Sequence, residues 1–119
     1  MKEINFLDLD NIFDALANQH RREIIYVLGL QPYSISQLAL QRGLSLPAIH
    51  KHIKILKEAG LIRIKKIGRT HFLTLSKNPL IRLQEWIMQY QTYWGSDEET
   101  LENYAQYLNK KSTKGGEKK

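Results

Sequence analysis

Residues 44–62 read LSLPAIHKHIKILKEAGLI. Ser45 is a residue type that caps helix N-termini, and Pro47 falls in the first turn, where its missing N–H costs nothing. Gly60 ends the predicted helix. Its buried face is predicted from three aliphatic residues at helical spacing, Ile49, Ile53 and Leu56. The stretch therefore predicts one amphipathic helix with a marked start and end.

The opposite face of this helix is polar, cationic and partly small and apolar. It carries Leu46, Pro47, His50, Lys51, Lys54 and Lys57, with no carboxylate before Glu58. The major groove of DNA offers phosphate oxygens at its rims and hydrogen-bond acceptors on its floor, which suits such a surface. We therefore expect a recognition helix. Its candidate base-reading residues are Ser45, Pro47, His50 and Lys51, with Lys54 nearer the backbone.

A basic β-hairpin follows the helix. Residues 61–67 alternate as in a half-buried strand, Gly68-Arg69 is a plausible tight turn, and residues 70–75 return as the partner strand. Side chains near its tip would reach phosphates or a neighbouring minor groove, and these are Lys65, Lys66, Arg69 and His71.

A short helix precedes the recognition helix. Ser34 and Gln37 match a capping box that starts it, and Gly43 ends it. Only residues 43–45 separate the two helices, which predicts that they cross steeply, as in a helix-turn-helix. Two earlier helices are predicted over residues 9–16 and from about residue 19 to Gly29.

Two helices are predicted after the hairpin. The first begins at Asn78-Pro79 and carries apolar residues as far as Trp94, and Gly95-Ser96 interrupts it. The second begins with the capping box at Ser96. We predict one domain over residues 1–109 and a disordered basic tail over residues 110–119. The fold class is mostly α, with five to six helices and a small antiparallel β-hairpin, arranged as a winged helix-turn-helix.

The sequence resembles the ArsR-type winged-helix repressors. Residues 12–25, 36–39 and, most specifically, 44–62 carry the resemblance, which covers roughly residues 9–94. It implies a homodimer that binds an operator and represses, with release when an effector binds. It also implies dimer contacts through the first and fifth helices, where the candidate residues are Leu9, Phe13, Leu83, Trp86, Ile87, Tyr90 and Trp94. Paired recognition helices about 34–36 Å apart would read an imperfectly palindromic double-stranded operator.

The chain departs from this family at the metal sites. Metal-sensing members place a cysteine pair where residues 34–36 read Ser-Ile-Ser, and this chain has no cysteine. It has no histidine after His71, and Glu85 is the one acid of the predicted fifth helix. We therefore expect neither a metal nor another cofactor. The identity of any small-molecule effector is left open, and Trp86, Tyr90 and Trp94 favour packing over a ligand pocket.

Composition narrows the function classes. A formal charge of +6 and a pI of about 9.6 favour nucleic acid, an acidic partner or a membrane surface. No apolar run approaches the ~20 residues that cross a bilayer, and the N-terminus lacks a signal-peptide pattern. We expect a cytoplasmic protein. The sequence contains no nucleophile elbow or phosphate-binding glycine loop, so an enzyme is not expected.

Two points stay open at this level. A winged helix can also bind RNA or dock a protein partner. An RNA-binding version usually shows exposed aromatic side chains, and a protein-docking version should show an apolar patch on the reading face, whereas this face carries lysines and a histidine. Arg21 and Arg22 could either support the fold or contact phosphate.

Overall fold

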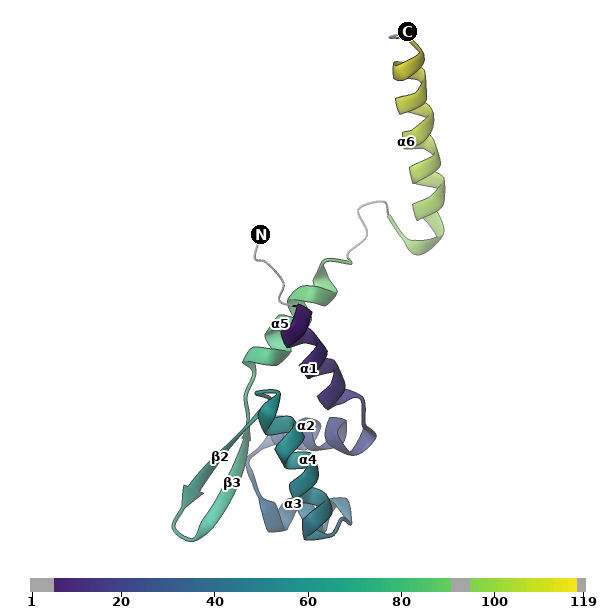
Figure 1. Ribbon diagram of the computed structural model, residues 1–119. Helices are drawn as coiled ribbons and strands as arrows, with labels where there is room; N and C mark the ends of the chain where they lie inside the picture. The colour runs from purple at the N-terminus through teal and green to yellow at the C-terminus, as the bar shows by residue number, and fades with distance from the viewer. Residues whose placement is uncertain (1–5, 91–94, 118–119) are drawn as a thin grey trace. The chain divides into compact units, whose positions relative to one another are not determined.

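A computed structural model describes residues 6–90 and 95–117 of the chain (Figure 1). The chain forms two units, residues 1–86 and 87–119, each described by itself. The elements in chain order are α1 (Phe6–Leu16), α2 (Gln19–Leu30), β1 (Tyr33–Ser34), α3 (Ile35–Arg42), α4 (Leu46–Glu58), β2 (Ile62–Ile67), β3 (Thr70–Leu75), α5 (Asn78–Met88) and α6 (Asp97–Glu117).

One hydrophobic core holds the first unit together. It collects aliphatic side chains from the helices and from the hairpin, and among its most buried members are Ile12, Ile24, Leu38, Ile49, Leu56, Leu61 and Leu73. The apolar stripe predicted for the recognition helix is buried as expected, since Ile49, Ile53 and Leu56 are at most 3% exposed. Burial of this face fixes which side of α4 is turned to solvent.

Capping residues define where α3 and α4, the two helices of the helix-turn-helix, begin and where α3 ends. Ser34 Oγ accepts from the Gln37 amide and the Gln37 side chain accepts from the Ser34 amide, so the predicted capping box is confirmed. Ser45 Oγ likewise accepts from the Ala48 amide at the start of α4. Gly43 ends α3 in the left-handed region at φ 65°, which costs glycine little because it has no Cβ.

The wing is part of a three-stranded antiparallel sheet of order β1-β3-β2. The predicted hairpin is confirmed, with Gly68 at φ 63° in its turn. Figure 1 shows the hairpin projecting from the helices of this unit. The third strand, β1, was not predicted; Tyr33 pairs with Leu73 and Ser34 with Phe72, so the start of α3 is hydrogen-bonded to the wing.

Two predicted boundaries near the C-terminus differ from the structure. α5 ends at Met88, not near Trp94, and the Tyr90 amide donates to the Ile87 carbonyl in a tighter i→i−3 turn. Trp94 lies outside the described residues. α6 continues to Glu117, so residues 110–117, assigned to a disordered tail, are helical; the lysines there are good helix formers.

Over the described residues, no helix combines the length and the apolar character that a membrane span requires.

Candidate nucleic-acid interface

The solvent-facing side of α4 carries most of the residues assigned to base reading. Ser45, Pro47, His50, Lys51 and Lys54 are all exposed. Lys57 and Glu58 follow them in the last turn, also exposed. The structure therefore places the polar and cationic residues of α4 together on the side of the helix that the core leaves free.

The wing separates its two lysines. Lys66 pairs with His71 and Lys65 pairs with Phe72 across the β2–β3 ladder. Because neighbouring residues of a strand point to opposite faces, Lys66 and His71 share one face and Lys65 lies on the other. Leu73 shares the face of Lys66 and His71 and is fully buried, so that face is turned toward the core. Lys65 and Lys66 are both exposed, so the wing carries its two lysines on opposite faces.

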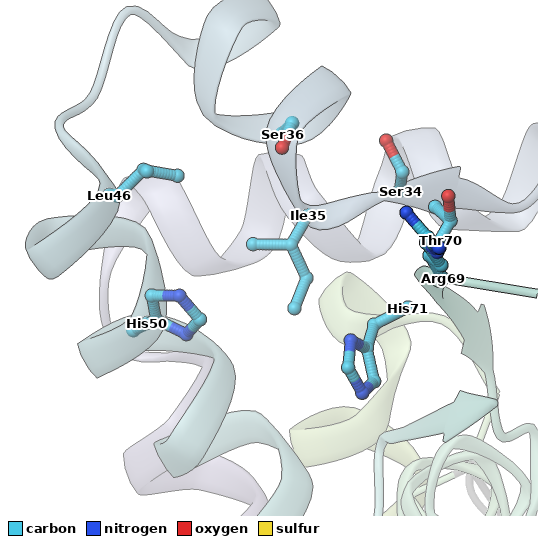
Figure 2. A pocket seen from close by; sticks show the side chains of 8 residues that line it. All are labelled: Ser34, Ile35, Ser36, Leu46, His50, Arg69, Thr70 and His71. Carbon is cyan, nitrogen blue, oxygen red and sulfur yellow. The ribbon is translucent and has the colours of Figure 1, made fainter. Parts of the chain in front are cut away.

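The recognition helix and the wing meet at a pocket of about 280 Å³. Its lining comes from the start of α3, from α4 and from the wing tip, and comprises Ser34, Ile35, Ser36, Leu46, His50, Arg69, Thr70 and His71. Figure 2 shows the imidazoles of His50 and His71 on two sides of the Ile35 side chain, which projects between them. Three residues predicted as DNA contacts, His50, Arg69 and His71, are thus brought together, whereas Lys51, Lys54, Lys65 and Lys66 do not line the pocket.

Sequence reasoning did not single out Leu46 and Thr70 as site residues. Leu46 opens α4 one turn before His50, and its side chain is 52% exposed. Thr70 directly follows the wing turn. Their positions in the sequence could have identified both. Leu46 lies one helical turn before His50, and Thr70 directly follows Arg69.

The two arginines left open by the sequence support the fold. Arg21 Nε donates to the Ala15 carbonyl at 2.6 Å and Arg21 Nη2 to the Asp14 carbonyl at 3.1 Å. Arg22 Nη1 donates to the Leu16 carbonyl at 2.8 Å. Carbonyls at a helix C-terminus lack intrahelical partners, so both side chains satisfy the end of α1.

His52 anchors α4 on the side opposite its candidate reading face. Its ring lies 5.7 Å from the ring of His20 on α2, and its Nδ1 is 3.4 Å from Arg21 Nη1. Burial, together with the positive charges of Arg21, His20 and Lys51, lowers the pKa of His52. A guanidinium only donates hydrogen bonds, so Nδ1 acts as the acceptor and the imidazole is neutral in this arrangement.

The residues assigned to dimerisation differ in how much of each side chain is exposed. Leu9 is 4% exposed and is buried within its own protomer, so it offers little surface to a second copy. Phe13 is 40% exposed, and its ring packs edge-on against Trp86 with centroids 5.1 Å apart. Leu83 is partly exposed, and in the second unit Ile87 and Tyr90 are exposed.

Among the described residues, no group of three or more His, Asp or Glu side chains is placed to hold a metal ion. Ser34 and Ser36 carry hydroxyls, and hydroxyls are poor ligands for soft metals.

The chain is similar to known transcriptional regulators. The family model described as bacterial regulatory protein, arsR family, matches residues 18–63. A crystal structure of an ArsR family transcriptional regulator is 33% identical, has a TM-score of 0.70, and is matched over 79% of this chain and 96% of that chain. The HTH-type transcriptional regulator Rv2034 of Mycobacterium tuberculosis is 29% identical over 83% of this chain and 87% of its own length.

A further relative is an uncharacterized HTH-type transcriptional regulator of Methanocaldococcus jannaschii. It is 34% identical over 50% of this chain. The match spans 62% of that protein, which is less than two thirds of its length. The winged helix-turn-helix predicted from the sequence is confirmed by the elements of the structure and by these likenesses.

Proposed function

Because this chain belongs to the ArsR family of bacterial regulatory proteins, we propose that it binds a specific double-stranded DNA operator as a homodimer and represses transcription. The family and the named relatives are transcriptional regulators with a winged helix-turn-helix, not enzymes. Operator sequence recognition, the homodimer and the repressing role are the parts that we propose.

One observation carries the proposal. The face of α4 opposite the core is exposed and cationic, and it borders the same pocket as Arg69 and His71 of the wing. A helix with this face can lie in the major groove while the wing reaches the backbone or the neighbouring minor groove. His50 and Lys51 would read base edges, and Lys54 would contact phosphate. Lys66 and Arg69 would add phosphate contacts from the wing.

The homodimer is supported by exposed apolar surface on α1 and α5. Phe13 and Trp86 form an aromatic pair that is only partly buried in one protomer, and Leu83 on α5 is also partly exposed. Aromatic side chains of this kind contribute strongly when a second surface covers them. Two protomers paired there would hold two α4 helices about one DNA turn apart, ~34–36 Å, and would require a palindromic operator.

Repression would follow from occupancy, because a dimer on an operator that overlaps a promoter blocks access to it. An effector that binds the DNA-free form better than the DNA-bound form would release the dimer from the operator. A ligand shifts the equilibrium between these two forms only through such a difference in affinity.

Fluorescence anisotropy tests the proposal. The purified protein is titrated into a labelled duplex from upstream of its own gene and into a scrambled duplex of equal length and composition, at two salt concentrations. We expect tighter binding to the native duplex and a steep loss of affinity with salt, because cationic contacts release counterions from DNA. The double variant His50→Ala/Lys51→Ala should remove the difference between the duplexes.

Equal weak binding to both duplexes, unchanged in the double variant, would contradict the proposal. The same titration with a single-stranded RNA of the same length would then test the alternative in which the winged helix binds RNA.

A further inference from the structure

The last helix, α6, carries a narrow apolar seam on its exposed surface. The seam consists of Leu101, Tyr104 and Leu108, which recur at the alternating three- and four-residue spacing of helices that pair with one another. Their side chains are 77%, 42% and 44% exposed. The ring of Tyr104 also stacks on the ring of Tyr107, with centroids 6.0 Å apart. Exposed apolar side chains that share one helix face favour burial against a second surface.

The charges of α6 are separated along its length. All of the following are exposed: the acids of the first two turns, Asp97, Glu98, Glu99 and Glu102, and the bases after the seam, Lys110 and Lys111. The helix dipole favours acids at the N-terminal end and bases toward the C-terminal end, so it accounts for the charges alone. It does not account for the apolar seam between them.

These charges decide what can cover the seam. A second copy of α6 that runs antiparallel brings its lysines beside the acidic turns of the first copy, and the reverse pairing follows by symmetry. A parallel copy would place like charges side by side, which costs free energy. An antiparallel pair of identical helices also has a two-fold axis, which is the symmetry of a homodimer. The charge pattern therefore favours a second copy of this chain in antiparallel orientation.

One register satisfies both the seam and the charges. When Leu108 of one copy faces Tyr104 of the other, the two-fold axis generates this contact twice. Leu101 then faces Lys111 of the other copy, whose aliphatic stem can cover the leucine while its ammonium group stays in water. Glu98 lies one turn before Leu101, within reach of that ammonium group.

The pairing is expected to be weak on its own. Three apolar side chains make a small seam, and short isolated helices are marginally stable in water. Only residues 89–96 separate α5 from α6. In a homodimer paired through α1 and α5, such short connections would keep the two copies of α6 at a high effective concentration, on the order of millimolar.

We propose that α6 pairs antiparallel with α6 of a second copy within the homodimer. The proposal rests on the homodimer proposed above and adds to it a contact made by different residues from those of α1 and α5. The likeness to the solved ArsR family relative does not imply this contact, because 96% of that chain is matched by 79% of this one, which leaves about as many residues unmatched as α6 contains. The contact would stabilise the dimer without touching DNA.

Single cysteines test the orientation, because the chain has no cysteine of its own. A short bifunctional maleimide is added to each full-length variant, and covalent dimers are measured on a denaturing gel. Ala105 lies near the two-fold axis, so Ala105→Cys should crosslink to its own copy. Glu98→Cys and Ser112→Cys should crosslink when mixed, because these positions lie opposite each other. Neither should crosslink alone, since its two copies would lie ~20 Å apart along the helix axis.

The outcomes separate this proposal from the homodimer itself. Gln106→Cys, exposed on the side of α6 away from the seam, is the control and should not crosslink. Self-crosslinking of Glu98→Cys and Ser112→Cys would indicate a parallel pair and overturn the proposal. If Ala105→Cys fails to crosslink while sedimentation velocity shows a dimer, the α6 contact is wrong and the homodimer stands. A monomer would contradict both.

A matched pair of variants tests whether the seam stabilises the dimer. Leu108→Glu places a carboxylate in the seam and should raise the dimer dissociation constant about tenfold or more. Gln106→Glu adds the same charge on the opposite side of α6 and should leave the dissociation constant unchanged. Circular dichroism compares the helical content of the two variants, and sedimentation velocity measures the dissociation constants. Equal dissociation constants for Leu108→Glu and Gln106→Glu would overturn the proposal.

Discussion

Arg21 Nη1 on α2 lies 3.4 Å from Nδ1 of His52 on α4, while the same guanidinium donates to two carbonyls at the end of α1. One side chain therefore joins three helices, and one of them is the candidate recognition helix. Because the candidate reading face of α4 lies opposite this junction, the junction holds that face relative to the rest of the unit.

Arg21→Ala should lower the free energy of unfolding by roughly 1–3 kcal/mol, because the partly buried Ala15 carbonyl loses its donor. Urea denaturation followed by circular dichroism measures this. Arg22→Ala is the matched control, since its exposed guanidinium donates to the Leu16 carbonyl, and it should cost less. Equal losses in the two variants would show that the contact with His52 adds nothing.

Stability should fall as the pH is lowered from about 7.5 to 5. The pKa of His52 is lowered in the folded chain, by burial first and then by Arg21, His20 and Lys51. The unfolded chain, with an ordinary histidine pKa of about 6.5, therefore takes up a proton before the folded chain does. The stabilisation is fully present above the unfolded value and is lost as the pH falls through the folded value.

His52→Asn should flatten this pH dependence, measured as the urea midpoint at several pH values. The asparagine side chain keeps an acceptor near Arg21 and has no proton to gain. His71→Asn, on the exposed wing, should retain the dependence. Superimposable profiles for His52→Asn and the unchanged chain would be evidence against a role for His52 in this pH range.

Lys54→Ala should weaken binding to all duplexes alike and reduce the slope of log K against log salt by about one. The reason is that a single phosphate contact, without base contacts, is removed. Anisotropy at four salt concentrations measures the slope. Lys77→Ala, exposed after β3 and outside the candidate interface, should leave it unchanged. A sequence-dependent loss in Lys54→Ala would instead assign this residue to base reading.

Phe13→Glu should convert the proposed homodimer to a folded monomer, because a charge would be buried against the partner. Sedimentation velocity gives the mass, and circular dichroism confirms the helical content. Tyr26→Glu is the control: Tyr26 is 69% exposed on α2 and lies outside the proposed dimer surface, so it should stay dimeric. A dimeric Phe13→Glu would place the dimer surface elsewhere.

Local signals in the sequence predicted much of this fold. The capping residues Ser34 and Ser45, the glycine at position 43 and the stripe of α4 each determine a nearby backbone feature, and all appear as predicted. The strand β1 could not be predicted, because two residues carry no periodicity and their pairing with β3 depends on tertiary contact. The end of α5 was placed too late because apolar spacing continued after the hydrogen bonding of the helix had ended.

The sequence predicted a set of candidate site residues, but not how those residues are arranged. The sequence placed His50 and the wing residues in one functional group, yet it gave no sign that His50, Arg69 and His71 line one pocket. It also could not tell that Leu9 packs inside the protomer while Phe13 remains half-exposed, because both share the same helical stripe.

The DNA sequences that His50→Ala selects show whether His50 reads a base. Duplexes from a random library are enriched separately with the unchanged protein, with His50→Ala and with the control Lys57→Ala, and the preferred sequences are compared. We expect His50→Ala to relax or change the preference at one position of each half-site, by about 1–3 kcal/mol, and Lys57→Ala to select the original sequence. An unchanged preference in His50→Ala would contradict the assignment of this face of α4 to base reading.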